Sequence, residues 1–228
     1  MTRLIGVCGC LALLSASVTG CQRERGMQGE RDDQPQHFAS QEEAVRKAIA
    51  DFAEVLRSGA DVQLGVDAAT LERAQPGPTV RRVDLDFTRL LAADSATTFD
   101  QLVASERNLV VPLIADGDVA TIVEVVRDDA GWRVVGLAGR DIASDLSAVL
   151  GAAGDTAASI TLYEVPNLQA RVYGVATDAG ERLHTDYQGR FSISQGVDAA
   201  TLLPVLRADA QTFERTYGDS ARAGRLLR

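Results

Sequence analysis

Hydrophobic residues recur every three or four positions near the start of the folded part of the chain, which is the spacing of one helix face. The segment 40–59 carries this period, and its apolar face consists of Val45, Ala48, Ile49, Phe52, Val55 and Leu56. Ser40 and Glu43 have the spacing of a capping box, and Gly59 supplies a stop. The pattern therefore predicts an amphipathic helix over 40–59, which needs a sheet or other helices to cover it.

Branched apolar residues instead fill two segments farther along, 109–115 and 119–126. Asp116-Gly117 between them is a favoured turn for a two-residue hairpin. A second turn over 128–131 leads into a third predicted strand over 132–138. Both faces of 109–115 are apolar, which is typical of a strand in the centre of its sheet. We therefore expect an antiparallel unit of three strands here.

The rest of the chain alternates between helical and strand patterns. Helices are predicted over 67–74, 141–150 and 205–217, whereas 80–91 fits either a strand or a helix. Further strands are predicted over 160–165, 168–177, 183–187 and 190–193. The sequence thus predicts an α+β fold, with a largely antiparallel sheet and with the N-terminal amphipathic helix and the later helices packed on it.

A verbatim repeat links two distant parts of the chain. The residues Gly-Val-Asp-Ala-Ala-Thr-Leu occupy 65–71 and again 196–202. Each copy has the pattern of a helix start, with an aspartate as the cap and a valine before it that can pack on the leucine. The copies indicate either a duplication or a common helix start in an alanine-rich chain, and the unmatched flanks favour the second. Pro204 is expected to begin a fresh helix after the second copy.

The first residues of the chain have the order of an export signal. Arg3 precedes an apolar stretch over 4–14, which is much shorter than the roughly 20 residues that a membrane-spanning helix needs. The segment Val18-Thr19-Gly20-Cys21 that follows resembles the lipobox of bacterial lipoprotein signal peptides. The resemblance implies a signal peptide over 1–20 and cleavage just before Cys21. It also implies that acyl chains on Cys21 anchor the protein to a lipid bilayer.

The lipoprotein resemblance also predicts a location and a domain organisation. It implies the bacterial cell envelope, and Gln22 after the cysteine, in place of an aspartate, favours the outer membrane. Residues 21–39 form the lipidated cysteine and a polar tether of mixed charge, which cannot bury enough apolar surface to fold. A single domain over 40–228 follows, with two halves at 40–152 and 153–228 if the repeat records a duplication. All three cysteines lie at or before Cys21, so no disulfide is expected in the mature chain.

The charge balance excludes one class of partner. The chain has a formal net charge of −9, with 32 acidic residues against 23 basic ones. An acidic protein repels phosphate backbones, so nucleic acid is not an expected partner.

Motifs for catalysis and metal binding are absent from the sequence. It contains no HExxH, CxxC or G-x-S-x-G pattern, and no metal or cofactor is expected. His184 and Asp186 lie two residues apart in a predicted strand, and with Ser192 or Ser194 they could support a hydrolase. An exposed polar strand face explains the pair with fewer coincidences. The sequence therefore favours a non-catalytic binding or interaction domain, whose partner is an envelope protein or a small ligand.

Overall fold

The computed structural model describes residues 35–59, 65–137, 139–154 and 159–222, with side chains to residue 218. The signal peptide and the lipidated Cys21 expected from the sequence lie outside the described residues. Residues from Pro35 to Arg228 form one compact unit with its own hydrophobic core, and units of this kind fold independently. Within the described residues, no helix is both long and apolar enough to cross a membrane.

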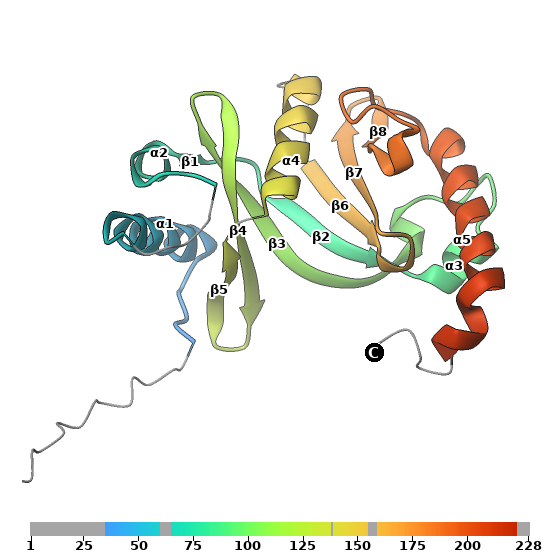
Figure 1. The fold of residues 1–228 in the computed structure, drawn as a ribbon, viewed down its shortest axis with the longest axis horizontal. Coiled ribbons are helices and arrows are strands. Elements are labelled where there is room, and N and C mark those ends of the chain that lie inside the picture. The colour runs from blue at the N-terminus through green and yellow to red at the C-terminus, as the bar shows by residue number, and fades with distance from the viewer. Residues whose placement is uncertain (1–34, 60–64, 138, 155–158, 223–228) are drawn as a thin grey trace, which may run out of the picture. The chain divides into compact units, whose positions relative to one another are not determined.

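The described unit is an α+β fold, as the sequence predicts (Figure 1). The helices are α1 (Gln41–Arg57), α2 (Ala68–Arg73), α3 (Phe87–Ala92), α4 (Arg140–Ala153) and α5 (Ala199–Arg222). The strands are β1 (Gln75–Pro76), β2 (Val80–Leu85), β3 (Val103–Ala115), β4 (Asp118–Asp128), β5 (Gly131–Leu137), β6 (Ser159–Val165), β7 (Ala170–Thr177) and β8 (Gly180–His184). The ambiguous segment 80–91 contains both predicted elements, a strand and then a helix, because Asp86 ends β2 and caps α3.

All eight strands of the described part join one sheet in the order β5-β4-β3-β2-β6-β7-β8, with β1 beside β3. Every neighbouring pair is antiparallel except β2 and β6, which are parallel. The prediction of a largely antiparallel sheet is therefore confirmed. The hairpin at Asp116-Gly117 is also confirmed, with both residues at positive φ as a tight two-residue turn requires.

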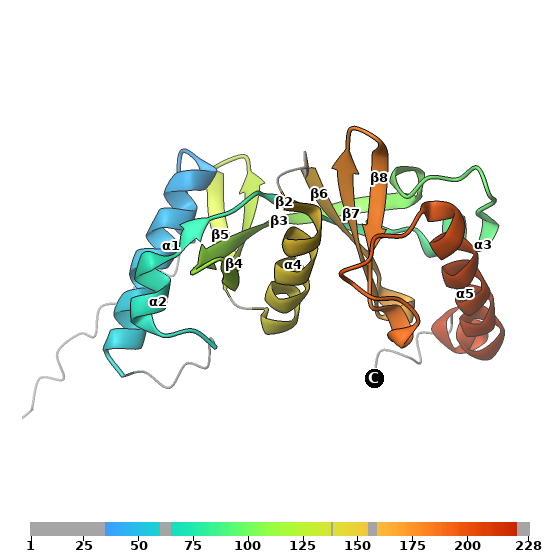
Figure 2. The ribbon, with the colours of Figure 1, turned by 90° about the horizontal axis from the view of Figure 1, so that it is seen from above.

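Three hydrophobic clusters hold the helices on this sheet, and we name each after its main helix. Val110 and Ile122 pack with α4 in the α4 cluster. Their chain neighbours Val111 and Val123 pack with α1 and α2 in the α1 cluster. Successive residues of a strand point to opposite faces, so α4 and the α1–α2 pair cover opposite faces of β3 and β4. In the α5 cluster, α3 and α5 cover β2, β6, β7 and β8 at the other end of the sheet (Figure 2).

Helix α1 begins with the capping box that the sequence suggests. The Ser40 hydroxyl accepts a hydrogen bond from the Glu43 amide at 3.1 Å, and the Glu43 carboxylate accepts one from the Ala39 amide at 3.1 Å. These two bonds satisfy amides that the first helical turn leaves without partners.

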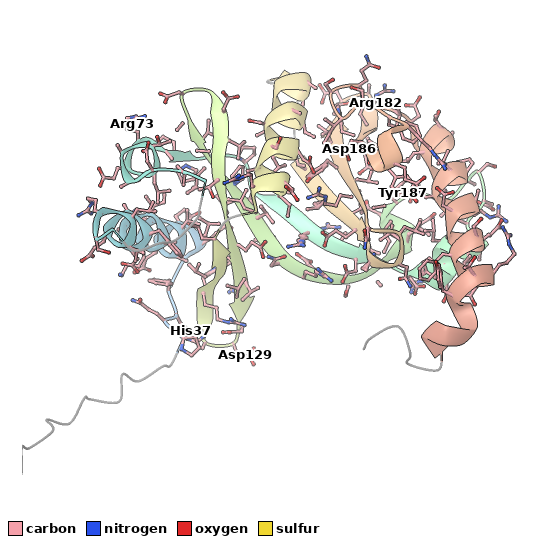
Figure 3. All side chains as sticks on the ribbon, viewed as in Figure 1. His37, Arg73, Asp129, Arg182, Asp186 and Tyr187 are labelled. Atoms are coloured by element: carbon pink, nitrogen blue, oxygen red, sulfur yellow. The ribbon has the colours of Figure 1, made fainter. Side chains whose placement is uncertain are left out.

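Phe38, expected in the flexible tether, is held by the domain. Its backbone exchanges two hydrogen bonds with Trp132 of β5, at 2.7 and 2.9 Å. Gly131 allows this approach, because a Cβ atom there would lie 2.7 Å from the Phe38 carbonyl oxygen. Figure 3 shows His37 beside the β4–β5 turn that carries Asp129. The contacts of the domain therefore include residues just before 40.

Two predictions near the C-terminus are wrong, namely the strand over 190–193 and the helix start at Pro204. Residues 190–193 form turns and bends and not a strand, because the chain folds back so that Val197 bridges Leu183 on the outer edge of β8. Pro204 also does not begin a helix, since α5 continues through it from Ala199. Proline removes one backbone hydrogen bond there, but the buried residues Leu202, Leu203 and Leu206 keep both sides of the proline on the core.

Candidate functional site

The histidine and aspartate proposed from the sequence are not brought together. His184 is buried, and its Nδ1 lies 2.9 Å from the Ile193 carbonyl oxygen. Asp186 is exposed beyond the end of β8 (Figure 3). Across the described residues, no hydrogen bond or ion pair joins the two side chains. Strand β8 ends at His184, so the alternation that would place both residues on one face does not reach Asp186.

The two serines considered with them contact each other. Their hydroxyl oxygens, Ser192 Oγ and Ser194 Oγ, lie 3.0 Å apart on an exposed loop. Ser194 also lines a small cavity together with His184. Within the described residues, neither hydroxyl is hydrogen-bonded to a histidine or a carboxylate, so this geometry does not assemble a catalytic triad.

A charged cluster lies on the central strands of the sheet, on the face that α4 partly covers. Arg82 of β2 donates two hydrogen bonds of 2.9 Å to the Glu164 carboxylate of β6 and one of 3.1 Å to Glu124 of β4. Asn108 of β3 donates a 2.7 Å bond to the second oxygen of Glu124. Arg107 adds bonds to Glu164 and to the neighbouring Asp84. The cluster therefore joins four strands by charge-assisted bonds.

The pairing inside this cluster indicates a structural role. Arg82, Glu124 and Glu164 are each less than about a quarter exposed, and all of them have charged partners. The Oδ1 atoms of Asp84 and Asn108 lack hydrogen-bond partners, but both are closed off from solvent. Buried charges persist when they are paired in this way, and a ligand cannot reach the two remaining acceptors without moving the cluster.

A second polar group surrounds the hydroxyl of Tyr163 on β6. The hydroxyl lies 3.1 Å from Asp100 Oδ1 and 2.9 Å from Glu181 Oε1, and its single hydrogen can serve only one of them at a time. Burial raises the pKa of Glu181, and the nearby negative charge of Asp100 raises it further. Gly174 makes room for this group, because a Cβ atom there would lie 2.2 Å from Glu181 Oε1 and 2.7 Å from the Tyr163 ring. The group is a site where the folded protein favours a bound proton.

A partly apolar groove runs along α5, and we call it the α5 groove. Its volume is about 490 Å³, within the range of small-ligand sites. One wall is the first half of α5 and the other is the loop that follows α3. The groove is lined by Ala93, Asp94, Ser95, Thr97, Ala199, Ala200, Leu203, Pro204, Arg207, Ala208 and Gln211.

Small side chains and a fixed turn create the α5 groove. On α5 the lining residues follow one helix face from Ala200 to Gln211, and alanine at several of these positions leaves the space open. On the other wall, Asp94 Oδ1 accepts hydrogen bonds of 3.0 Å from the Ala96 amide and 2.9 Å from the Thr97 hydroxyl. These bonds hold the shape of the loop, as in other turns closed by an aspartate side chain.

Arg207 is the one basic residue that lines the α5 groove. Its Nε atom is buried without a hydrogen bond, and nowhere in the described part of the chain does its side chain form an ion pair. The nearest acidic residue along the helix, Asp209, pairs with Arg190 at 3.2 Å. An arginine has five donors, so the groove presents a half-buried positive charge with unused hydrogen-bonding capacity. Sequence reasoning missed Arg207, since only the fold shows which arginines remain unpaired.

The α5 groove contains no set of residues for metal binding. Across the described ranges, no group of three or more histidine, cysteine, aspartate or glutamate residues is placed to hold a metal ion. The polar atoms that line the groove belong to Asp94, Ser95, Thr97, Arg207 and Gln211, and the Thr97 hydroxyl is already bonded to Asp94. The arrangement is suited to binding by shape and charge.

Comparison with known proteins adds no family to this description. The chain matches no protein-family model, and neither a curated protein nor a solved structure matches it.

Proposed function

We propose that this chain is a lipid-anchored protein of the bacterial cell envelope, whose domain binds a small ligand in the α5 groove without catalysing a reaction. The observation that carries the binding role is a partly apolar groove whose one basic lining residue, Arg207, forms no ion pair within the described residues. Pockets that combine an apolar lining with a few placed polar groups are the usual form of small-molecule sites. The anchor is supported by the resemblance of the segment before Cys21 to a lipobox.

The binding role can be tested with 1-anilinonaphthalene-8-sulfonate, a dye that fluoresces strongly in apolar sites. The chain from Gln22 onward contains the whole compact unit and avoids signals from membrane lipid. We expect saturable binding of one dye molecule and its loss in Ala208→Phe, which fills the groove at an exposed position. Thr216→Phe is the matched control, because it adds the same ring to the same helix outside the groove. Equal dye binding by both variants would contradict the proposal.

The anchor is tested independently by labelling cells with radioactive palmitate. The unchanged chain should incorporate label and be cleaved before Cys21. Cys21→Ser should block both events, since only a cysteine sulfur at that position can receive the lipid. Equal incorporation into the Cys21→Ser protein would show that the lipobox interpretation is wrong.

The alternative function, a hydrolase that uses His184 and Asp186, makes an opposite prediction. A general base contributes about 10²–10⁴-fold to a rate, so His184→Ala would then abolish most activity. We expect instead that the unchanged protein hydrolyses p-nitrophenyl acetate only slowly, and that His184→Ala leaves this rate unchanged. A loss of a hundredfold or more, with the fold intact by circular dichroism, would favour the hydrolase.

A further inference from the structure

We infer that the ligand of the α5 groove carries one negative charge, bound by Arg207, on an apolar body. This inference rests on the proposed function and specifies the chemical class of the ligand. It follows from the charges that the two walls of the groove present to each other.

The helix wall supplies the attraction. Arg207 is half-buried, lines the groove and forms no ion pair within the described residues. Its Nε is closed off from solvent, so a ligand would meet the other nitrogens of the guanidinium. Withdrawing a charged group from water is unfavourable unless an opposite charge or hydrogen bonds compensate it. Other arginines near this end of the fold have partners: Arg190 pairs with Asp209 and Arg182 pairs with Asp198. An anion in the groove would give the Arg207 guanidinium a partner that the described residues do not provide.

The loop wall disfavours a second negative charge on the ligand. The Thr97 hydroxyl and then the Ala96 amide hold the pKa of Asp94 below its ordinary value, so this carboxylate is ionised near neutral pH. Asp94 lines the groove opposite the helix wall, and Arg207 is the one basic side chain among the lining residues. A second negative charge on the ligand would therefore face a carboxylate without a second cation to offset it.

The lining between Arg207 and Asp94 is mostly apolar, so it favours a ligand with an apolar body. Four alanines, Leu203 and Pro204 supply its apolar surface, and among them Ala93 and Leu203 are buried against the protein core. Burial of apolar surface stabilises a complex by about 25 cal/mol per Å² before the costs of association. An aliphatic chain or a single ring fits this lining, and a strongly hydrated inorganic ion does not.

The test compares four probes with the same eight-carbon chain, measured by titration calorimetry on the chain from Gln22 onward. The probes are octanoate, 1-octanol, octanedioate and octylammonium. We expect octanoate to bind about tenfold more tightly than 1-octanol, because hydrogen bonds to a charged group are stronger than those to a neutral one. Octanedioate and octylammonium should bind more weakly than octanoate, since each places an unfavourable charge next to Asp94 or Arg207.

Three variants assign the selectivity to Arg207. Arg207→Gln should reduce octanoate binding to the level of 1-octanol and leave 1-octanol binding unchanged. Arg207→Lys keeps the charge and should retain part of the preference, because lysine lacks the planar fork that matches a carboxylate. Arg215→Gln is the control, since Arg215 lies on the same helix outside the groove and should keep the full preference.

The outcomes separate this inference from the proposed function. If octanoate and 1-octanol bind equally to the unchanged protein, or if Arg207→Gln keeps the preference for octanoate, the inference is overturned and the groove remains a binding site. If octylammonium binds most tightly, Asp94 determines selectivity and the inference is also overturned. If no probe binds and Ala208→Phe has no effect on dye binding, the proposed function itself fails.

Discussion

The two copies of the seven-residue repeat start helices at opposite ends of the sheet. The first copy starts α2 in the α1 cluster, and the second starts α5 in the α5 cluster. The leucine that ends each copy, Leu71 or Leu202, has no exposed surface. The valine of each copy, Val66 or Val197, packs against the same cluster as its leucine. Identical local sequences thus produce the same helix start.

The copies differ in how the aspartate is used and in how far the helix continues. Asp67 accepts a 2.6 Å hydrogen bond from the Thr70 amide, which is the ordinary cap. Asp198 instead forms a 2.6 Å ion pair with Arg182 of β8, and its backbone carbonyl accepts the Thr201 amide. Helix α2 ends at Arg73, whereas α5 continues to Arg222 and forms the groove. The repeat determines a helix start, and the surroundings determine what the helix does.

The largest expected loss of stability comes from replacing the buried leucine of either copy, Leu71 or Leu202. Leu71→Ala and Leu202→Ala should each lower the free energy of unfolding by about 2–5 kcal/mol, because each removes a fully buried side chain and leaves a cavity. Urea unfolding followed by circular dichroism measures both values. A loss below 1 kcal/mol for either leucine would show that its end of the sheet collapses around the cavity.

The next largest difference in stability is expected between alanine substitutions at two glycines, one from each end of the sheet. Gly174→Ala in β7 should lower the free energy of unfolding by about 1–3 kcal/mol, because its Cβ atom would meet the Tyr163 ring at 2.7 Å. Gly136→Ala in β5 is the matched control, since no atom lies closer than 3.6 Å to the added Cβ. Thermal unfolding of the two variants should therefore differ, and equal melting temperatures would contradict the crowding at Gly174.

The aspartates of the two copies should differ by a smaller amount. Asp67→Ala removes a helix cap and should cost about 1 kcal/mol. Asp198→Ala removes an exposed ion pair, which contributes about 0.2–1 kcal/mol, and leaves the backbone carbonyl that accepts the Thr201 amide. Urea unfolding of the two variants checks this order. The reverse order would indicate that the second copy depends on its link to β8.

The smallest predicted effect concerns pH and the group around Tyr163, in the half of the sheet that α5 covers. Burial and Asp100 raise the pKa of Glu181 above its ordinary value of 4.5, so the folded state holds its proton more tightly than the unfolded state does. The unchanged protein should therefore lose stability relative to Glu181→Gln as the pH rises from 4.5 towards neutral. Below pH 4.5, the stability of the unchanged protein and that of Glu181→Gln should change with pH in the same way. Parallel stability curves across the whole range would show that Glu181 does not hold the proton.

Local patterns in the sequence predicted most of the elements correctly. The period of Val45 and its neighbours, the Asp116-Gly117 turn and the branched strands around it each depend on residues close together in the chain. Such residues report which face of an element is buried and where the backbone must turn, and both are largely local properties. The errors at 190–193 and at Pro204 arose where contacts with distant residues outweighed a local preference, namely the bridge to Leu183 and the burial of Leu202 and Leu206.

The sequence by itself determined the α+β class, the largely antiparallel sheet, the helix start in each repeat copy and the resemblance to a lipoprotein signal. Only the tertiary structure decided that β2 and β6 run parallel, that His184 and Asp186 lie apart, and that Arg207 forms no ion pair within the part of the chain that the structure describes. The reason is physical: a charge pair or a cavity wall joins residues that are distant in the chain. Whether an arginine is paired therefore depends on the path of the whole backbone, which no local spacing records.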